Sequence, residues 1–215
     1  MDIVGYCTAL GLATAAGLNA WIPLLATGLL ARYTDVIHLS GTWTSLENTG
    51  VLVALAIVAV LDFVADKVPG FDHVLHAAGT VIAPVTGVAA ALASSSALDV
   101  SPALMMVIGI GAAAASHGTR MAIRPFSTLA TGGLGNPAVS LVEDAVSAAL
   151  SLLAIILPVL AALTVAAMFA FVWRVIGRMR RARGGTGSAA VGPRRRSATR
   201  DRPGGMGSKM ASSRP

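Results

Sequence analysis

The sequence has few charged and few aromatic side chains. Only 12% of its 215 residues are Asp, Glu, Lys or Arg, and Phe, Trp and Tyr make up 5%. Soluble globular domains carry about 25% charged residues, so this composition excludes an ordinary soluble domain. The single cysteine, Cys7, excludes an intrachain disulfide framework. No basic residue precedes the first apolar run, which argues against a cleaved signal peptide.

Long apolar runs take the place of the missing charge, since 55% of the residues are hydrophobic. A helix needs about 20 mostly apolar residues to cross a bilayer. Four segments meet this length requirement, namely residues 3–30, 51–68, 73–93 and 102–120. A fifth segment, residues 137–176, is long enough for two crossings. The last stretch turns either near residues 147–151 or at Pro158. We therefore expect an all-α, polytopic membrane helix bundle with six crossings, or five as the alternative.

The charges are unevenly distributed along the chain. Residues 174–215 contain twelve basic residues and one acidic residue, a net charge of +11, whereas residues 1–173 have a net charge of −5. With six crossings and both termini in the cytoplasm, the inner segments hold Lys67, Arg120, Arg124 and the basic C-terminal residues. The outer loops then hold Arg32 alone. This asymmetry follows the positive-inside rule and predicts cytoplasmic N- and C-termini.

The C-terminal segment, residues 178–215, is rich in Gly, Ser, Pro and Arg. It has too little apolar surface to offset its chain entropy, so we expect a disordered basic tail after a transmembrane domain of residues 1–177. Basic residues beside a bilayer are attracted to anionic lipid headgroups. A topology anchor is the simplest interpretation, and specific lipid, protein or nucleic-acid binding is the alternative. No aromatic residue follows Trp173, so we expect no specific nucleic acid.

Two sequence landmarks recur in order and predict an internal duplication. Residues 15–25 resemble residues 115–126, and the segment around Pro84 resembles the segment around Pro158. Each half, about residues 1–98 and 99–177, also has an acidic pair. If each half crosses three times, the halves insert with opposite orientation, the inverted-repeat plan common in transporters.

Three segments resemble an uncharacterised bacterial membrane family, the "domain of unknown function" family numbered 4126. They are GLNAWIPLLA at residues 17–26, DFVADKVPGFDH at residues 62–73 and GGLGNPAVSLVEDA at residues 132–145. The resemblance covers about residues 5–175 and excludes the tail. It implies an integral membrane domain of the bacterial cytoplasmic membrane and no established chemistry. Asn19 departs from the basic residue that the family often has at that position.

Ionisable residues within the apolar segments are the main functional candidates, because burying them in a membrane costs several kcal/mol unless they are paired or hydrated. One hypothesis is that the two acidic pairs face each other and bind a cation or relay protons, with Arg120 as counter-charge. The alternative is that these groups are solvated at the headgroups. The predicted pathway residues are Asn19, Asp62, Asp66, Arg120, Glu143 and Asp144.

Glycine and proline mark two candidate helix breaks. Gly17 and Pro23 interrupt the first apolar run, and the second break contains Gly132, Gly133, Gly135, Asn136 and Pro137. Asn favours the helix N-cap and Pro the first turn, so a helix is expected to begin at the second break. That segment is either a re-entrant loop, as at transporter binding sites, or an ordinary cytoplasmic turn.

The enzyme class has the least support. Asp72, His73 and His76 are close in sequence, but a closed zinc site needs four ligands, so we expect no metal and no cofactor. No nucleophile elbow, P-loop or HExxH motif is present. The leading hypothesis is a small transporter or channel for a small solute or ion. A non-transporting scaffold or lipid-interaction protein is the alternative, and Ala-rich helix faces favour close packing or a homo-oligomer.

Overall fold

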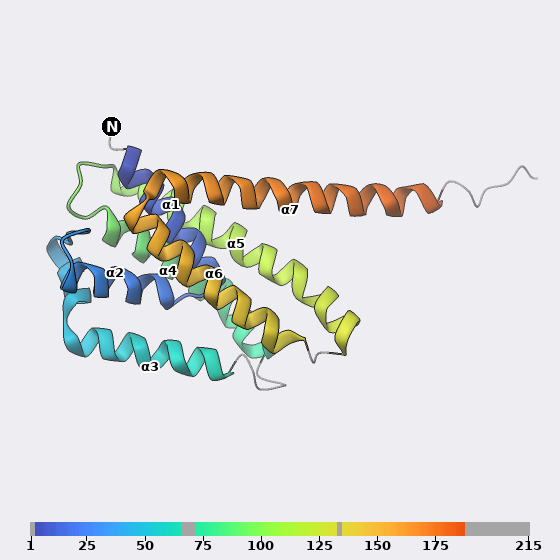
Figure 1. Cartoon of the computed structure of the whole chain (residues 1–215), viewed down its shortest axis with the longest axis horizontal. Coiled ribbons are helices and arrows are strands. Elements are labelled where there is room, and N and C mark those ends of the chain that lie inside the picture. Colours follow the sequence, from blue (N-terminus) through green and yellow to red (C-terminus); the bar gives the residue numbers. More distant parts are fainter. Residues whose placement is uncertain (1–2, 66–71, 133–134, 188–215) are drawn as a thin grey trace, which may run out of the picture. The chain divides into compact units, whose positions relative to one another are not determined.

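The computed structural model describes residues 3–65, 72–132 and 135–187, excepting the side chains of residues 72–76, 124, 126–128, 130 and 179–187. Within these ranges the regular elements are all helices, joined by loops, and there is no strand. The helices, shown in Figure 1, are α1 (Ile3–Leu18), α2 (Ile22–Tyr33), the 3-10 helix η1 (Gly41–Glu47), α3 (Thr49–Ala65), α4 (Asp72–Ser94), α5 (Pro102–Thr131), α6 (Asn136–Ile156) and α7 (Pro158–Gly187).

Four of the described helices are long and apolar enough to cross a membrane. The candidate spans are Ala77–Ser94, Pro102–Ile123, Asn136–Ile156 and Pro158–Arg178. A fifth results if η1 and α3, which meet at a bend of 68°, count as one span. The all-helical, apolar character that composition predicts is confirmed and is consistent with an integral membrane protein. The six-crossing count stays a prediction.

The prediction of one crossing over residues 3–30 is wrong. The segment forms two shorter helices, α1 with 16 residues and α2 with 12. A hydropathy profile does not reveal that the segment forms two helices, because only Asn19 among the residues between them is strongly polar. In the stretch of residues 137–176, by contrast, the turn lies at Leu157 and α7 begins at Pro158. This confirms the second of the two predicted positions, since proline suits the first turn of a helix.

The chain divides into two compact units, residues 1–173 and residues 174–215. Of the second unit, the structure describes residues 174–187, which belong to α7. The helix therefore continues past the predicted boundary at residue 177, because Arg and Met are good helix formers. Residues 188–215, the rest of the predicted tail, lie outside the described residues, and their disorder stays a prediction.

Helix α1 is the central helix of the first unit. It packs against α4, α5 and α6, and eleven of its 16 residues are buried. Small residues allow these close approaches. A Cβ added at Gly11 would lie 2.6 Å from the Cβ of Ala154, and one added at Gly17 would lie 2.4 Å from the carbonyl oxygen of Ala113.

Helices α1 and α5 run in the same direction. Ala9 shares a buried cluster with Met105, and Gly17 packs against Ser116 farther along both helices. The two landmarks of the predicted duplication therefore pack against each other. Their shared direction differs from the opposite orientation that an inverted repeat requires.

The start of α1 lies at the same end of the unit as two later helix connections. A cavity of about 250 Å³ is lined by Val4 together with His38, Leu98 and Pro158. We call this the Val4 end, and we call the opposite end, where α1 stops, the Asn19 end. Because α2 leads from Asn19 back to the segment before His38, α1 and α2 form a hairpin that starts and finishes at the Val4 end (Figure 1).

Candidate functional site

Asn19 occupies the break between α1 and α2 and caps the start of α2. Its side-chain Oδ1 accepts hydrogen bonds from the backbone N–H groups of Trp21, at 3.0 Å, and Ile22, at 3.2 Å. These N–H groups have no carbonyl partner within their own helix, so a buried Asn oxygen is a suitable acceptor. Pro23 lies in the first turn of α2, where a missing N–H costs nothing.

The other end of the Asn19 amide connects two carboxylates from distant helices. Nδ2 donates to Oδ1 of Asp144 on α6, at 2.9 Å, and to Oδ2 of Asp62 on α3, at 3.4 Å. Both donors and both lone pairs of the amide are therefore used. Since exchanging its oxygen and nitrogen would place donors against the N–H groups of α2, the side chain has one stable orientation. Asn19 is 3% exposed, so water does not replace these bonds.

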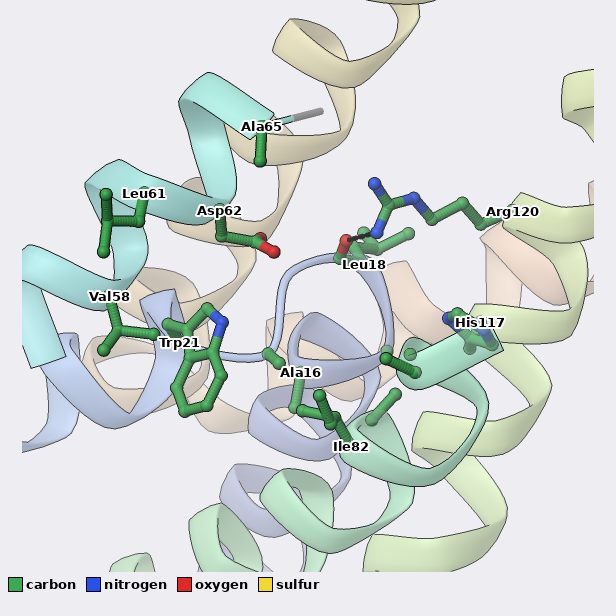
Figure 2. A pocket seen from close by; sticks show the side chains of 15 residues that line it. Ala16, Leu18, Trp21, Val58, Leu61, Asp62, Ala65, Ile82, His117 and Arg120 are labelled. Atoms are coloured by element: carbon green, nitrogen blue, oxygen red, sulfur yellow. Dashed lines mark hydrogen bonds between the residues drawn. The ribbon is translucent and has the colours of Figure 1, made fainter. Parts of the chain in front are cut away.

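Arg120 on α5 connects the end of α1 to α6. Its Nε lies 2.7 Å from Oε2 of Glu143, and both side chains are nearly buried, at 11% and 12% exposure. Its Nη1 donates to the carbonyl oxygen of Leu18 at 3.0 Å, the dashed line in Figure 2. A cation at a helix C-terminus satisfies the last carbonyls and complements the helix dipole. Arg120 therefore stabilises the buried end of α1.

A cavity of about 260 Å³ opens beside these residues (Figure 2). Asp62, Arg120 and His117 supply its charged and titratable side chains, and Trp21 lines it too. The remainder of the lining is small or apolar, namely Ala16, Gly17, Leu18, Ala20, Val58, Leu61, Ala65, Ala78, Gly79, Ile82 and Ala83. The His117 ring lies against Gly79, where an added Cβ would approach its Cε1 to 2.7 Å.

Asp144 is the most deeply buried acidic residue of the site, at 7% exposure. Its Oδ1 accepts from Asn19, but its Oδ2 has no hydrogen-bond partner within the part of the chain that the structure describes. A buried carboxylate oxygen without a donor is costly, because the group loses its hydration without replacement.

Sequence reasoning missed a polar stripe on α6. Ser140, Asp144, Ser147 and Ser151 are all buried and lie four, three and four residues apart, which places them on one helix face. The Ser147 hydroxyl donates to the carbonyl oxygen of Ala15 at 2.9 Å. Periodic serines in an otherwise apolar run were the available signal. They show which face of α6 contacts α1.

Comparison with known families gives one match, which covers most of the chain. The model of the family described as "Domain of unknown function (DUF4126)" matches residues 6–178. The chain belongs to the DUF4126 family. No curated protein and no solved structure matches it. The match covers α2 to α6, most of α1 and α7, and every described residue of the site, so the site belongs to the family domain.

Five of the six predicted pathway residues come together in this DUF4126 protein. Asn19 contacts Asp62 and Asp144, and Arg120 contacts Glu143. The sixth, Asp66, lies outside the described residues. Asp62 shares its donor with Asp144, whereas Glu143, adjacent in sequence to Asp144, pairs with Arg120 instead. The role of these residues in a transport pathway stays a prediction.

The second candidate break of this DUF4126 protein connects α5 to α6 and holds none of the site's ionisable residues. Gly132 follows α5 with a φ of 62°, a left-handed conformation that favours glycine. Asn136 was predicted to be the N-cap of α6. The helix begins one residue earlier than expected, at Asn136, so Gly135 is the N-cap and Pro137 lies in the first turn. Gly133 lies outside the described residues. The polar cluster lies instead at the break that contains Asn19.

Among the residues that the structure describes, no three His, Cys, Asp or Glu side chains gather closely enough to hold a metal ion. The side chains of the Asp72, His73 and His76 cluster lie outside the described residues. The geometry of the site is that of hydrogen-bonded carboxylates beside a cavity. The Asp62 carboxylate, the Arg120 guanidinium and the Trp21 indole line that cavity.

Proposed function

We propose that this DUF4126 protein is a small transporter or channel that moves a small solute or ion across the bacterial cytoplasmic membrane. One observation carries the proposal. Asn19, Asp62 and Asp144 meet where two short helices break, and a cavity of about 260 Å³ opens at the same place. Polar groups gathered at a helix break beside a cavity are typical of transporter binding sites.

The position of the break along the helices supports a location of this cluster at membrane depth. Helix α1 has 16 residues, so Asn19 lies about 24 Å from the Val4 end. Twelve residues, or about 18 Å, separate Asp144 from the end of α6 at Ile156. The hydrocarbon core is about 30 Å thick. With the helices close to the membrane normal, the cluster lies inside the core, in the half nearer the Asn19 end.

This depth favours transport over a scaffold role. A scaffold whose charges only set topology predicts carboxylates at the headgroups around a dry core. Instead Asp144 is buried and Asp62 lines a cavity. Ionisable groups inside the hydrocarbon are costly, and their usual role is in substrate or ion pathways.

The architecture also bears on membrane orientation. Arg120 lies toward the Asn19 end, so the positive-inside rule favours a cytoplasmic position for that end. The N-terminus was predicted to be cytoplasmic, but α1 begins at the Val4 end, which favours an outer N-terminus. In this arrangement α1 and α2 enter and return as a hairpin, and α3 to α7 make five crossings. The C-terminal tail stays cytoplasmic, where its basic residues attract anionic lipid headgroups.

Flux measurements in proteoliposomes test this proposal. The purified chain is reconstituted and assayed for uptake and efflux of a panel of inorganic ions, organic ions and small neutral solutes. We expect flux above that of empty vesicles for at least one class, and a loss of that flux in Asp62→Asn. Asp99→Asn, an exposed acid at the Val4 end, is the matched control. Flux equal to that of empty vesicles throughout would favour the scaffold alternative.

A further inference from the structure

Helix α3 forms one side of the cavity of about 260 Å³. The residues that it contributes are Val58, Leu61, Asp62 and Ala65. Their spacing places all four on one face of the helix. In Figure 2 this face lies across the cavity from Ile82 of α4 and His117 of α5. The width of the cavity therefore depends on the position of α3 relative to α4 and α5.

The packing of α3 is concentrated near its start. Its extensive contacts are with α2 and η1, whereas α4 packs against α1 and α5. Leu52 is the one buried residue of α3, and its Cδ2 would lie 2.9 Å from a Cβ added at Gly28 of α2. Leu61, by contrast, is 61% exposed although it lines the cavity. The half of α3 beside the cavity is thus held less tightly than the half that precedes it.

A suitable hinge precedes α3. The helix meets η1 at a bend of 68°, and exposed Asn48 between them has an extended backbone, with φ −68° and ψ 132°. The Asn48 N–H donates to the Ser45 carbonyl of η1, and the Asn48 carbonyl accepts from the N–H of Leu52 in α3. A change in ψ of Asn48 keeps both bonds, because each moves with its own helix. Hinges are commonly such residues at the ends of elements.

A weak hydrogen bond joins the far half of α3 to the break between α1 and α2. Asn19 Nδ2 donates to Asp62 Oδ2 at 3.4 Å, beyond the usual range of about 2.7–3.2 Å. The Asn19 side chain is also bonded to Trp21 at 3.0 Å, Ile22 at 3.2 Å and Asp144 at 2.9 Å. Asp62 can therefore separate from Asn19 while Asn19 keeps its position. A weak bond to a fixed partner suits a contact that opens and closes.

We propose that α3 is a gate for the cavity. The helix pivots at Asn48, and the contact between Asp62 and Asn19 holds it in the closed position. Displacement grows with distance from the pivot, so the cavity opens most at the Asn19 end, which is cytoplasmic in the proposed orientation. As the gate of a transporter this inference rests on the proposed function, but the motion itself is measured without any flux.

Distances between spin labels test the motion. The full chain in lipid nanodiscs, in a Cys7→Ser background, carries one label at Val81→Cys of α4 and another at Val53→Cys or Val64→Cys of α3. Val53 and Val64 are 51% and 52% exposed, so the two labels have similar freedom. They lie about 8 Å and about 24 Å from Asn48 along the helix, so a pivot displaces Val64 about threefold farther. We expect electron–electron double resonance to give a broader distance distribution for the Val64 pair.

The variant Asp62→Ala removes the acceptor of the contact that closes the gate. We expect it to shift the distance between Val64 and Val81 to longer values, and the distance between Val53 and Val81 about threefold less. Asp99→Ala, at an exposed acid of the Val4 end, is the control and is expected to shift neither. An unchanged Val64 distance in Asp62→Ala, or equal shifts at both positions, would overturn the proposal. Equal distribution widths in the chain with native Asp62 would overturn it even if the variant fails to fold.

The two proposals fail separately. Motion of α3 without flux of any solute would leave the gate in place and remove the transport function. Flux of a solute through a chain in which Val64 is as fixed as Val53 would leave transport in place and remove the gate.

Discussion

The side-chain amide of Asn19 donates to the Asp144 carboxylate at 2.9 Å and joins the break between α1 and α2 to the middle of α6. The same side chain accepts two hydrogen bonds from the start of α2. Asn19 thus caps the start of α2 and also positions the acidic side chains of the site. The break between α1 and α2 and the geometry of the site therefore depend on the same residue.

Replacement of Asn19 by alanine is expected to destabilise the protein. The variant loses the cap of α2, worth about 0.5–2 kcal/mol, and removes the Asn19 donor from the buried Asp144 carboxylate, at about 1–3 kcal/mol. Thermal unfolding in detergent measures the loss. Asn48→Ala is the matched control, since exposed Asn48 accepts a local hydrogen bond from Gly50 at 2.8 Å. An equal loss in both variants would contradict the role assigned to Asn19.

The Arg120–Glu143 pair is expected to show strong coupling. Arg120→Met alone leaves Glu143 buried without its counter-charge, which costs about 3–5 kcal/mol. The double variant Arg120→Met with Glu143→Gln removes both charges and is expected to recover much of that loss. A double-mutant cycle of unfolding free energies measures the coupling. Additive losses would show that the 2.7 Å contact contributes nothing specific.

Two glycines at corresponding positions of the predicted duplication are expected to differ sharply. Gly17→Ala places a Cβ 2.4 Å from the Ala113 carbonyl oxygen, so α1 and α5 must separate and stability falls. Gly118→Ala has no neighbour within 4 Å, and alanine's higher helix propensity makes it neutral or more stable by up to about 1 kcal/mol. The melting temperatures of the two variants measure this difference in stability. A similar decrease in melting temperature at both positions would refute the close α1–α5 contact.

Cysteine labelling tests the hairpin formed by α1 and α2. In a Cys7→Ser background, single cysteines replace exposed Val4, Leu98 and Thr131, one variant each. A membrane-impermeant maleimide applied to oriented vesicles is expected to label Val4→Cys and Leu98→Cys from one side and Thr131→Cys from the other. Labelling of Val4→Cys together with Thr131→Cys would instead support an N-terminus on the same side as the α5–α6 connection.

Parts of the fold follow from the chemistry of single residues and were predictable. Runs of about 20 apolar residues produce the helices that contain Ala77–Ser94, Pro102–Ile123 and Asn136–Ile156. Pro158 starts a helix because it lacks an N–H donor and fits the first turn. Gly17 and Pro23 marked the break that contains Asn19, since α1 ends at Leu18 and α2 begins at Ile22. That the chain reverses there was not predicted, because a single polar residue barely lowers the mean hydropathy of a long window.

The composition of the chain determined that it forms apolar helices, because few charges and long apolar runs leave no other way to satisfy the backbone in a membrane. It also drew attention to the acidic residues and to Arg120. Only the tertiary structure decided which of them meet. Asn19 and Asp144 are 125 residues apart, and their contact depends on the rotation and direction of α1 and α6. Close packing of small residues such as Gly11 against Ala154 sets that rotation, and no local pattern in α1, which is apolar on every side, reveals it.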